Sequence, residues 1–130
     1  LIYGGSALQG KGYYFQPTAI RLKDNNAEIL QHEIFGPVAI IVPFKTKEEV
    51  IDLANNTDAG LASYVFSENE DTLNYFAEKL EFGEVQLNGV KYDIYLPHGG
   101  VKNSGIGVDC STYALDDYLI KKRVSLALDK

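Results

Sequence analysis

Few side chains in this sequence have the chemistry of a nucleophile or of an acid–base catalyst. The single thiol belongs to Cys110, which follows Asp109, and a neighbouring carboxylate disfavours the reactive thiolate. No histidine adjoins Cys110 in sequence, so no base is placed to take its proton. We therefore interpret Cys110 as a small residue at the start of a helix. His32 and His98 are too few for a metal cluster, which argues against a zinc site.

The carboxylate of Glu33 is a better candidate for a binding site. It precedes Phe35 and a Gly36-Pro37 turn that leads into an apolar run. A carboxylate at the start of a strand is able to accept hydrogen bonds from two ribose hydroxyls, as acidic residues do in nucleotide sites. Composition alone favours a solvated turn glutamate at position 33, and Phe35 taken alone is typical of a core residue. From the residues alone, both alternatives stay open.

The elements that position these residues form a βαβαβ pattern in the middle of the chain. Buried strands are predicted from three apolar runs, at residues 38–42, 61–66 and 84–88. Two helices are predicted between them, with capping boxes that begin at Thr46 and at Ser67. The first helix ends at Asn55-Asn56, and Gly83 stands where a glycine is expected at the end of the second. Short links of this kind favour parallel strands and an α/β fold.

The segments on either side of this core are less regular. Glycines make residues 1–18 a loop-rich segment, and residues 24–31 predict a short helix capped by Asp24. Residues 92–107 are rich in glycine and proline, and we expect an ordered loop there. The apolar anchors that favour order are Tyr95, Leu96, Val101 and Ile106.

The end of the chain predicts a helix over residues 112–120 and a half-buried strand over residues 124–128. That strand has no hairpin partner nearby, and an unpaired strand is a template for another chain. A three-stranded parallel core is also small, because parallel sheets need cover on both faces. Both points favour a piece that completes something larger.

The composition narrows the class of protein. Hydrophobic residues make up 45% and charged residues 23% of 130, which is ordinary for one soluble globular domain. The net charge of −6 argues against a nucleic-acid partner. No apolar stretch approaches the roughly 20 residues of a membrane span. A single cysteine excludes an internal disulfide and fits the cytoplasm, where we expect the protein. The absence of methionine favours a fragment, a processed product or an unusual start.

Five stretches in order resemble the C-terminal third of the NAD(P)-dependent aldehyde dehydrogenases, including lactaldehyde-, glyceraldehyde- and succinate-semialdehyde-type members. The stretches are residues 12–18, 33–38 (Glu-Ile-Phe-Gly-Pro-Val), 53–57 with 60–62, 82–85 with 87–88, and 99–105 (Gly-Gly-Val-Lys-Asn-Ser-Gly). One such motif would be weak, and five in order are specific. The resemblance implies an α/β fold with the parallel βαβαβ core of the family's catalytic domain. It implies that residues 1–107 belong to that domain. Residues 108–130 would then form a terminal helix and a strand that pairs across a subunit interface in a homo-oligomer, a dimer or tetramer.

The resemblance also assigns roles. Glu33 would hold the nicotinamide ribose hydroxyls of NAD or NADP, and Phe35 would pack against the nicotinamide side of the cofactor. Tyr92 and His98 would line the entrance for a small aldehyde. The family's nucleophilic cysteine is not among these residues, so no catalytic residue is assigned here. We expect this chain alone to be inactive and to bind neither cofactor well.

The sequence departs from the family pattern at three places. Ala59 replaces a usual aromatic residue, and Val108-Asp109 stands where many members carry Arg-Glu. His98 replaces the Phe of a Pro-Phe-Gly-Gly sequence, and similar histidine-bearing loops occur in lactaldehyde-type members. An imidazole there is able to hydrogen-bond to a substrate hydroxyl, which favours lactaldehyde, glyceraldehyde or glycolaldehyde. A histidine that is merely tolerated in the loop is the alternative.

The preferred hypothesis is the C-terminal portion of an enzyme that oxidises a small, hydroxylated aldehyde to the carboxylic acid with NAD(P)+. The main alternative is a non-catalytic, stand-alone remnant that serves as an oligomerisation or regulatory module. A free-standing enzyme that uses Cys110 is a third possibility.

Overall fold

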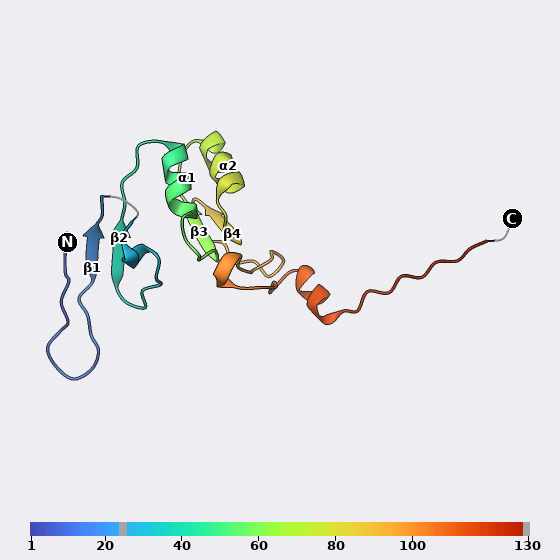
Figure 1. Cartoon of the computed structure of the whole chain (residues 1–130), viewed down its shortest axis with the longest axis horizontal. Coiled ribbons are helices and arrows are strands. Elements are labelled where there is room, and N and C mark those ends of the chain that lie inside the picture. The colour runs from blue at the N-terminus through green and yellow to red at the C-terminus, as the bar shows by residue number, and fades with distance from the viewer. Residues whose placement is uncertain (24–25, 129–130) are drawn as a thin grey trace.

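The structure, a computed structural model, describes residues 1–23 and 26–128. The elements along these residues are β1 (Thr18–Arg21), the 3₁₀ turn η1 (Glu28–Leu30), β2 (Val38–Ile41), α1 (Lys47–Asn55), β3 (Ala62–Val65), α2 (Glu70–Lys79), β4 (Glu84–Leu87), and the 3₁₀ segments η2 (Lys102–Ser104) and η3 (Tyr113–Tyr118). Figure 1 shows β1 and β2 at one end, the two helices with β3 and β4 in the middle, and the last residues running outward.

The strands form two separate parallel sheets of two strands each. In the first, β1 pairs with β2 and Thr18 stands opposite Val38; in the second, β3 pairs with β4 and Ala62 stands opposite Glu84. The predicted α/β fold with parallel strands is confirmed, but the single three-stranded βαβαβ sheet is wrong. The partner of β2 is β1, which lies at the edge of the predicted loop-rich segment. A four-residue strand directly after Pro17 is too short to give a clear apolar run.

The two helices begin with side-chain caps. Thr46 Oγ1 accepts from Glu49 N at 3.1 Å, and Glu49 Oε2 accepts from Lys45 N at 2.6 Å, so the first predicted capping box is confirmed with its return bond one residue earlier. The second box is wrong. The cap of α2 is Asn69, whose Oδ1 accepts from the Thr72 amide at 2.8 Å, while Ser67 belongs to the preceding turn.

Gly83 is not the C-terminal glycine of α2, because the helix ends at Lys79 and its capping residue is Leu80. A Cβ at Gly83 would overlap the carbonyl oxygen of Gly99, so the glycine permits a close approach of two backbone segments. The loop at 92–107 is ordered as predicted, but not by apolar anchors. Ile106, for example, is fully exposed. The loop is held instead by hydrogen bonds, among them those from Val101 N to Gly60 O at 3.0 Å and from Asn103 N to Asp58 O at 2.9 Å.

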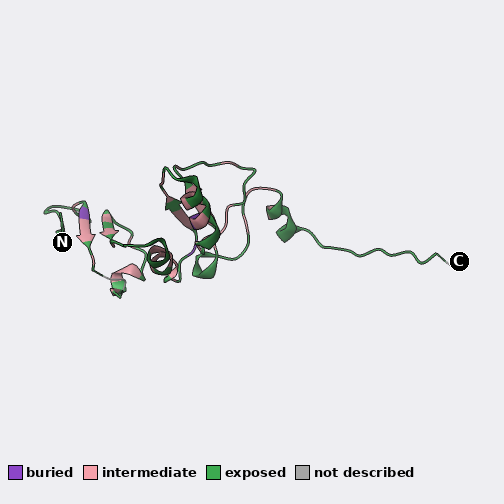
Figure 2. Cartoon of the chain, turned by 90° about the horizontal axis from the view of Figure 1, so that it is seen from above, coloured by how far each residue is buried: buried purple, intermediate pink, exposed green. Residues whose placement is uncertain are grey.

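Very little of the described chain is buried. Phe76 on α2, Thr18 on β1 and Gly60 before β3 are the buried residues among those described, and most of the ribbon in Figure 2 is exposed. The accessible surface is 10937 Å². A folded monomer of 14.4 kDa exposes about 6,800 Å². Many large apolar side chains are among the exposed residues, including Phe35, Tyr95 and Ile120.

The C-terminal predictions hold only in part. The helix predicted over residues 112–120 is the 3₁₀ segment η3, and the strand predicted over residues 124–128 is not formed. Val124, Leu126 and Leu128 are exposed, and no strand among the described residues pairs with this segment. The helix predicted over 24–31 is the short turn η1, and its predicted cap, Asp24, lies outside the described residues.

Neither helix found in the described ranges has the length and apolarity needed to cross a membrane.

Candidate functional site

Tyr92 and His98 line the same hollow, of about 270 Å³, beside the start of β4. Both residues come from the loop between β4 and η2, and the opposite wall is built by the strands. The other polar or aromatic side chains that line it are Tyr64, Glu84, Gln86, Lys91 and Asp93. The structure thus brings together the two residues predicted to contact the substrate.

His98 is held at both its backbone and its ring. Its amide donates to Asp109 O at 2.8 Å and its carbonyl accepts from Asp109 N at 2.7 Å. Its Nδ1 contacts Glu84 Oε1. The imidazole remains 44% exposed, whereas the Glu84 side chain is 19% exposed. The Nδ1 edge of the ring therefore contacts Glu84 on β4, and the opposite edge is accessible to a ligand.

The carboxyl group of Glu84 is engaged through both oxygens. Gln86 Nε2 donates to Glu84 Oε2 at 3.2 Å, and Gln86 Oε1 accepts from the Lys91 amide at 3.2 Å. The hydrogen bond from His98 is the main cause that lowers the pKa of Glu84, and the bond from Gln86 adds to it against the opposing effect of burial. Glu84 is therefore ionised at neutral pH.

Tyr92 leans toward the only cysteine of the chain. Its hydroxyl lies 3.7 Å from Cys110 Sγ, and this contact is the main cause that raises the pKa of Tyr92. The phenol is thus a neutral hydroxyl at physiological pH. Cys110 has a φ of 61° and lies three residues before η3, so it does not start a helix directly.

Glu33 and Phe35 lie elsewhere, on the loop between η1 and β2. Both are exposed, Phe35 to 93%, and neither lines the hollow that holds Tyr92 and His98. Phe35 is therefore not a core residue of this structure. In the described part of the chain, no hydrogen bond or ion pair occupies the Glu33 carboxylate. A carboxylate is able to accept hydrogen bonds from ribose hydroxyls, and an exposed aromatic ring is able to pack against a flat ring.

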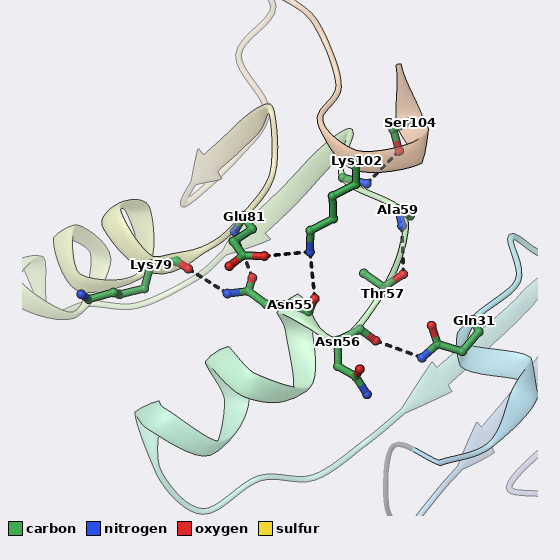
Figure 3. Close-up of polar contacts among 10 residues, drawn as sticks. Gln31, Asn55, Asn56, Thr57, Ala59, Lys79, Glu81, Lys102 and Ser104 are labelled. Atoms are coloured by element: carbon green, nitrogen blue, oxygen red, sulfur yellow. Dashed lines mark hydrogen bonds and ion pairs between the residues drawn. The ribbon is translucent and has the colours of Figure 1, made fainter. Parts of the chain in front are cut away.

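The glycine-rich loop that follows His98 is fastened to the ends of both helices (Figure 3). Lys102 Nζ donates to Asn55 O at 2.8 Å and pairs with Glu81 Oε2 at 3.0 Å. Ser104 Oγ accepts from Gly60 N at 2.7 Å. These contacts fix the position of the loop, and through it the backbone of His98.

Asn55 completes this arrangement by joining the two helices. Its Nδ2 donates to Lys79 O at 2.9 Å, and its Oδ1 accepts from Glu81 N at 2.9 Å (Figure 3). The prediction that α1 ends at Asn55-Asn56 is confirmed. The long-range role of the Asn55 side chain was not predicted.

Glu84 and Gln86 were missed as site residues, because the sequence assigned them only to a strand. A signal for them does exist. Side chains two apart in a strand point to the same face, so a Glu-x-Gln pair in a strand predicts a polar patch on that face.

Comparisons with known proteins give a consistent result. The model of the aldehyde dehydrogenase family matches residues 1–124. The succinate-semialdehyde dehydrogenase of Paenarthrobacter nicotinovorans is 39% identical over 127 residues, which is 97% of this chain and 28% of that protein. The solved structure of a lactaldehyde dehydrogenase superposes with a TM-score of 0.88 at 35% identity, over 96% of this chain and 26% of that one.

A third similarity is to the aldehyde dehydrogenase of Bacillus cereus, solved in complex with NAD+. Its TM-score is 0.82 at 41% identity, over 89% of this chain and 24% of that chain. The chain thus spans about a quarter of the length of the relatives it matches. The family match covers nearly all of its residues, together with the Gly-Pro turn and the glycine-rich loop described above. The chain therefore belongs to the aldehyde dehydrogenase family.

Proposed function

We propose that this chain is one portion of an enzyme that oxidises a small, hydroxylated aldehyde to its carboxylic acid with NAD or NADP. The observation that carries the proposal is the shared hollow of Tyr92 and His98, within a chain of this family. The large exposed apolar surface supports a portion that is covered by further protein. Placement in the C-terminal third of the enzyme remains a prediction from the order of the motifs.

Glu33 and Phe35 are the residues proposed to hold the cofactor. The Glu33 carboxylate would accept hydrogen bonds from the ribose hydroxyls, and the exposed ring of Phe35 would cover one side of the nicotinamide. When bound, NAD(P)+ supplies the hydride acceptor of the oxidation. The isolated chain offers only this half of a binding site, so we expect it to bind the cofactor weakly and to be inactive alone.

The polar lining of the hollow supports a neutral, hydroxylated substrate. Lys91 Nζ pairs with Asp93 Oδ2 at 3.4 Å, which leaves the ionised Glu84 as the uncompensated charge next to His98. An aldehyde with a carboxylate of its own would meet like charge here. Lactaldehyde, glyceraldehyde and glycolaldehyde would instead offer a hydroxyl to His98 or Tyr92.

A second candidate function rests on the exposed surface. A non-catalytic chain that docks on a full-length relative would cover the same apolar side chains. Pairing of residues 124–128 with another subunit, giving a dimer or tetramer, fits either proposal, as does a cytoplasmic location. A free-standing enzyme based on Cys110 would lose NAD-dependent activity on alkylation of this short chain.

Replacement of Glu33 tests the enzyme proposal. The first step is the intact mass of the native polypeptide, which should be several times 14.4 kDa. In that polypeptide, Glu33→Gln should lower kcat about tenfold or more, because the cofactor is held less well in its reactive position, with little change in Tm. Glu68→Gln, an exposed carboxylate before α2, is the matched control. A native mass of 14.4 kDa, or unchanged kinetics in Glu33→Gln, would contradict the proposal.

A further inference from the structure

We propose that Glu84, supported by Gln86, is a positioning residue that fixes the imidazole of His98 with its proton on Nδ1 and its Nε2 lone pair available in the hollow. In this state His98 accepts a hydrogen bond and therefore selects aldehydes that carry a hydroxyl donor. The inference rests on the substrate class proposed above, and it identifies Glu84 as the residue on which the preference for that class depends.

The backbone brings the two side chains together. Gly83 and Gly99 approach so closely that a side chain at Gly83 would overlap the Gly99 carbonyl. Glu84 directly follows Gly83, and His98 directly precedes Gly99. The carbonyl and amide of His98 are paired with Asp109, so the ring has a fixed point of attachment. The main chain thus places the side chains of Glu84 and His98 within reach of each other.

The chemistry of the pair decides which ring nitrogen carries the proton. An ionised carboxylate has no hydrogen to donate, so His98 Nδ1 must donate to Glu84 Oε1. A neutral imidazole has one donor and one acceptor, which leaves Nε2 as the acceptor. Gln86 holds the other carboxylate oxygen, which keeps Glu84 from turning away from the ring.

The consequence for substrates follows from this assignment. A hydroxylated aldehyde donates its hydroxyl proton to Nε2, whereas the analogue without that hydroxyl leaves the acceptor unsatisfied. A site built to bind a substrate hydroxyl discriminates against such an analogue, because its polar group is then left without a partner. Glu84 does not itself touch the substrate in this account. It acts through His98.

The state of the ring can be measured directly. In the native polypeptide with ¹⁵N-labelled histidine at neutral pH, His98, assigned by its loss in His98→Asn, should show a protonated Nδ1 and an unprotonated Nε2. In Glu84→Gln the Nδ1-protonated and Nε2-protonated tautomers of His98 should both be populated, because an amide is able to donate or to accept a hydrogen bond. Glu78→Gln, an exposed carboxylate on α2, should leave the wild-type signals unchanged. A proton on Nε2 in the wild type, or identical signals in Glu84→Gln, would overturn the inference.

Kinetics separates this inference from the proposed substrate class. The ratio of kcat/KM for lactaldehyde over propionaldehyde should fall about three- to tenfold in Glu84→Gln, the size expected for one weakened hydrogen bond, through KM for lactaldehyde alone. Glu84→Asp should restore part of the ratio. An equal fall of kcat/KM for both substrates in Glu84→Gln would mean that Glu84 has only a structural role. If His98→Asn leaves the ratio unchanged, the proposed substrate class fails, whatever the tautomer of the ring.

Discussion

The N-terminal strand pair, β1 with β2, and the central unit, residues 46–109, use the same building block of two short parallel strands. They differ in what joins the strands. In the central unit α2 connects β3 to β4 and packs Phe76 inward, and the following loop returns to both helices. In the N-terminal pair the described part of the connection from β1 to β2 contains the turn η1 and no α-helix.

This difference indicates where a site with defined geometry is able to form. The central unit holds His98 through contacts that begin and end within this chain. The N-terminal pair presents Glu33 and Phe35 on an exposed loop, as an open half of a site. If the proposed roles hold, the hollow proposed for the substrate is largely built within these residues, while the proposed cofactor site needs surfaces from further protein.

The largest expected effect comes from adding a side chain at Gly83, where the backbone of the central unit closely approaches the backbone of Gly99. Gly83→Ala should lower the free energy of unfolding by about 3 kcal/mol, because its Cβ would overlap the Gly99 carbonyl, which cannot move without displacing the loop. Urea denaturation measures this. Gly36→Ala is the matched control, since the nearest atom to its Cβ would lie 3.9 Å away. Equal stability of the two variants would show that the close approach is not formed.

An intermediate effect is expected where the helices are joined. Asn55→Ala removes two hydrogen bonds, to Lys79 O and from Glu81 N, and should cost about 1–3 kcal/mol. Asn56→Ala is the control, because only the backbone carbonyl of Asn56 accepts from Gln31 Nε2, and its side chain makes no hydrogen bond with the described residues. Denaturation of both variants, followed with hydrogen exchange, should show faster exchange in the central unit for Asn55→Ala alone. Similar losses of stability in both variants would contradict the role of Asn55 in joining the two helices.

The smallest expected effect tests whether the two regions open independently. Thr18 Oγ1 accepts from Gly5 N and donates to Gln16 O, both at 2.8 Å. Thr18→Val keeps the shape but removes both bonds, and should cost about 1–2 kcal/mol. Hydrogen exchange should quicken at the amides of residues 2–5 and leave the central unit unchanged. Faster exchange throughout would mean that the two regions unfold together and that the comparison does not hold.

The sequence predicted most of the central unit because its signals are local. The cap at Thr46, the end of α1 and the strands at 62–65 and 84–87 each depend on neighbouring residues, and each is present. The sheet order was not predictable in this way. A strand as short as β1 has almost no periodicity, so its pairing with β2 is decided by tertiary contacts.

The candidate site shows the same division. The resemblance to the family pointed to His98 and Tyr92, and the structure places both in one hollow. Glu84 was missed because its role depends on a residue 14 positions away, across a close contact of two glycines. Gly83 was noticed for a local reason, as a helix terminator, when its actual partner lies in a distant loop. Local patterns identify special residues but do not reveal what they face.

The hydrogen bonds of the glycine-rich loop in Figure 3 join residues that are far apart in sequence, which has a consequence for synthesis on the ribosome. Lys102 reaches back to Asn55 over 47 residues, and Ser104 to Gly60 over 44. Neither contact is possible until the glycine-rich loop has left the exit tunnel, and contacts of such long separation form late. The nascent chain therefore carries α1, β3, α2 and β4 without their final restraint, and during this interval its exposed apolar side chains favour aggregation.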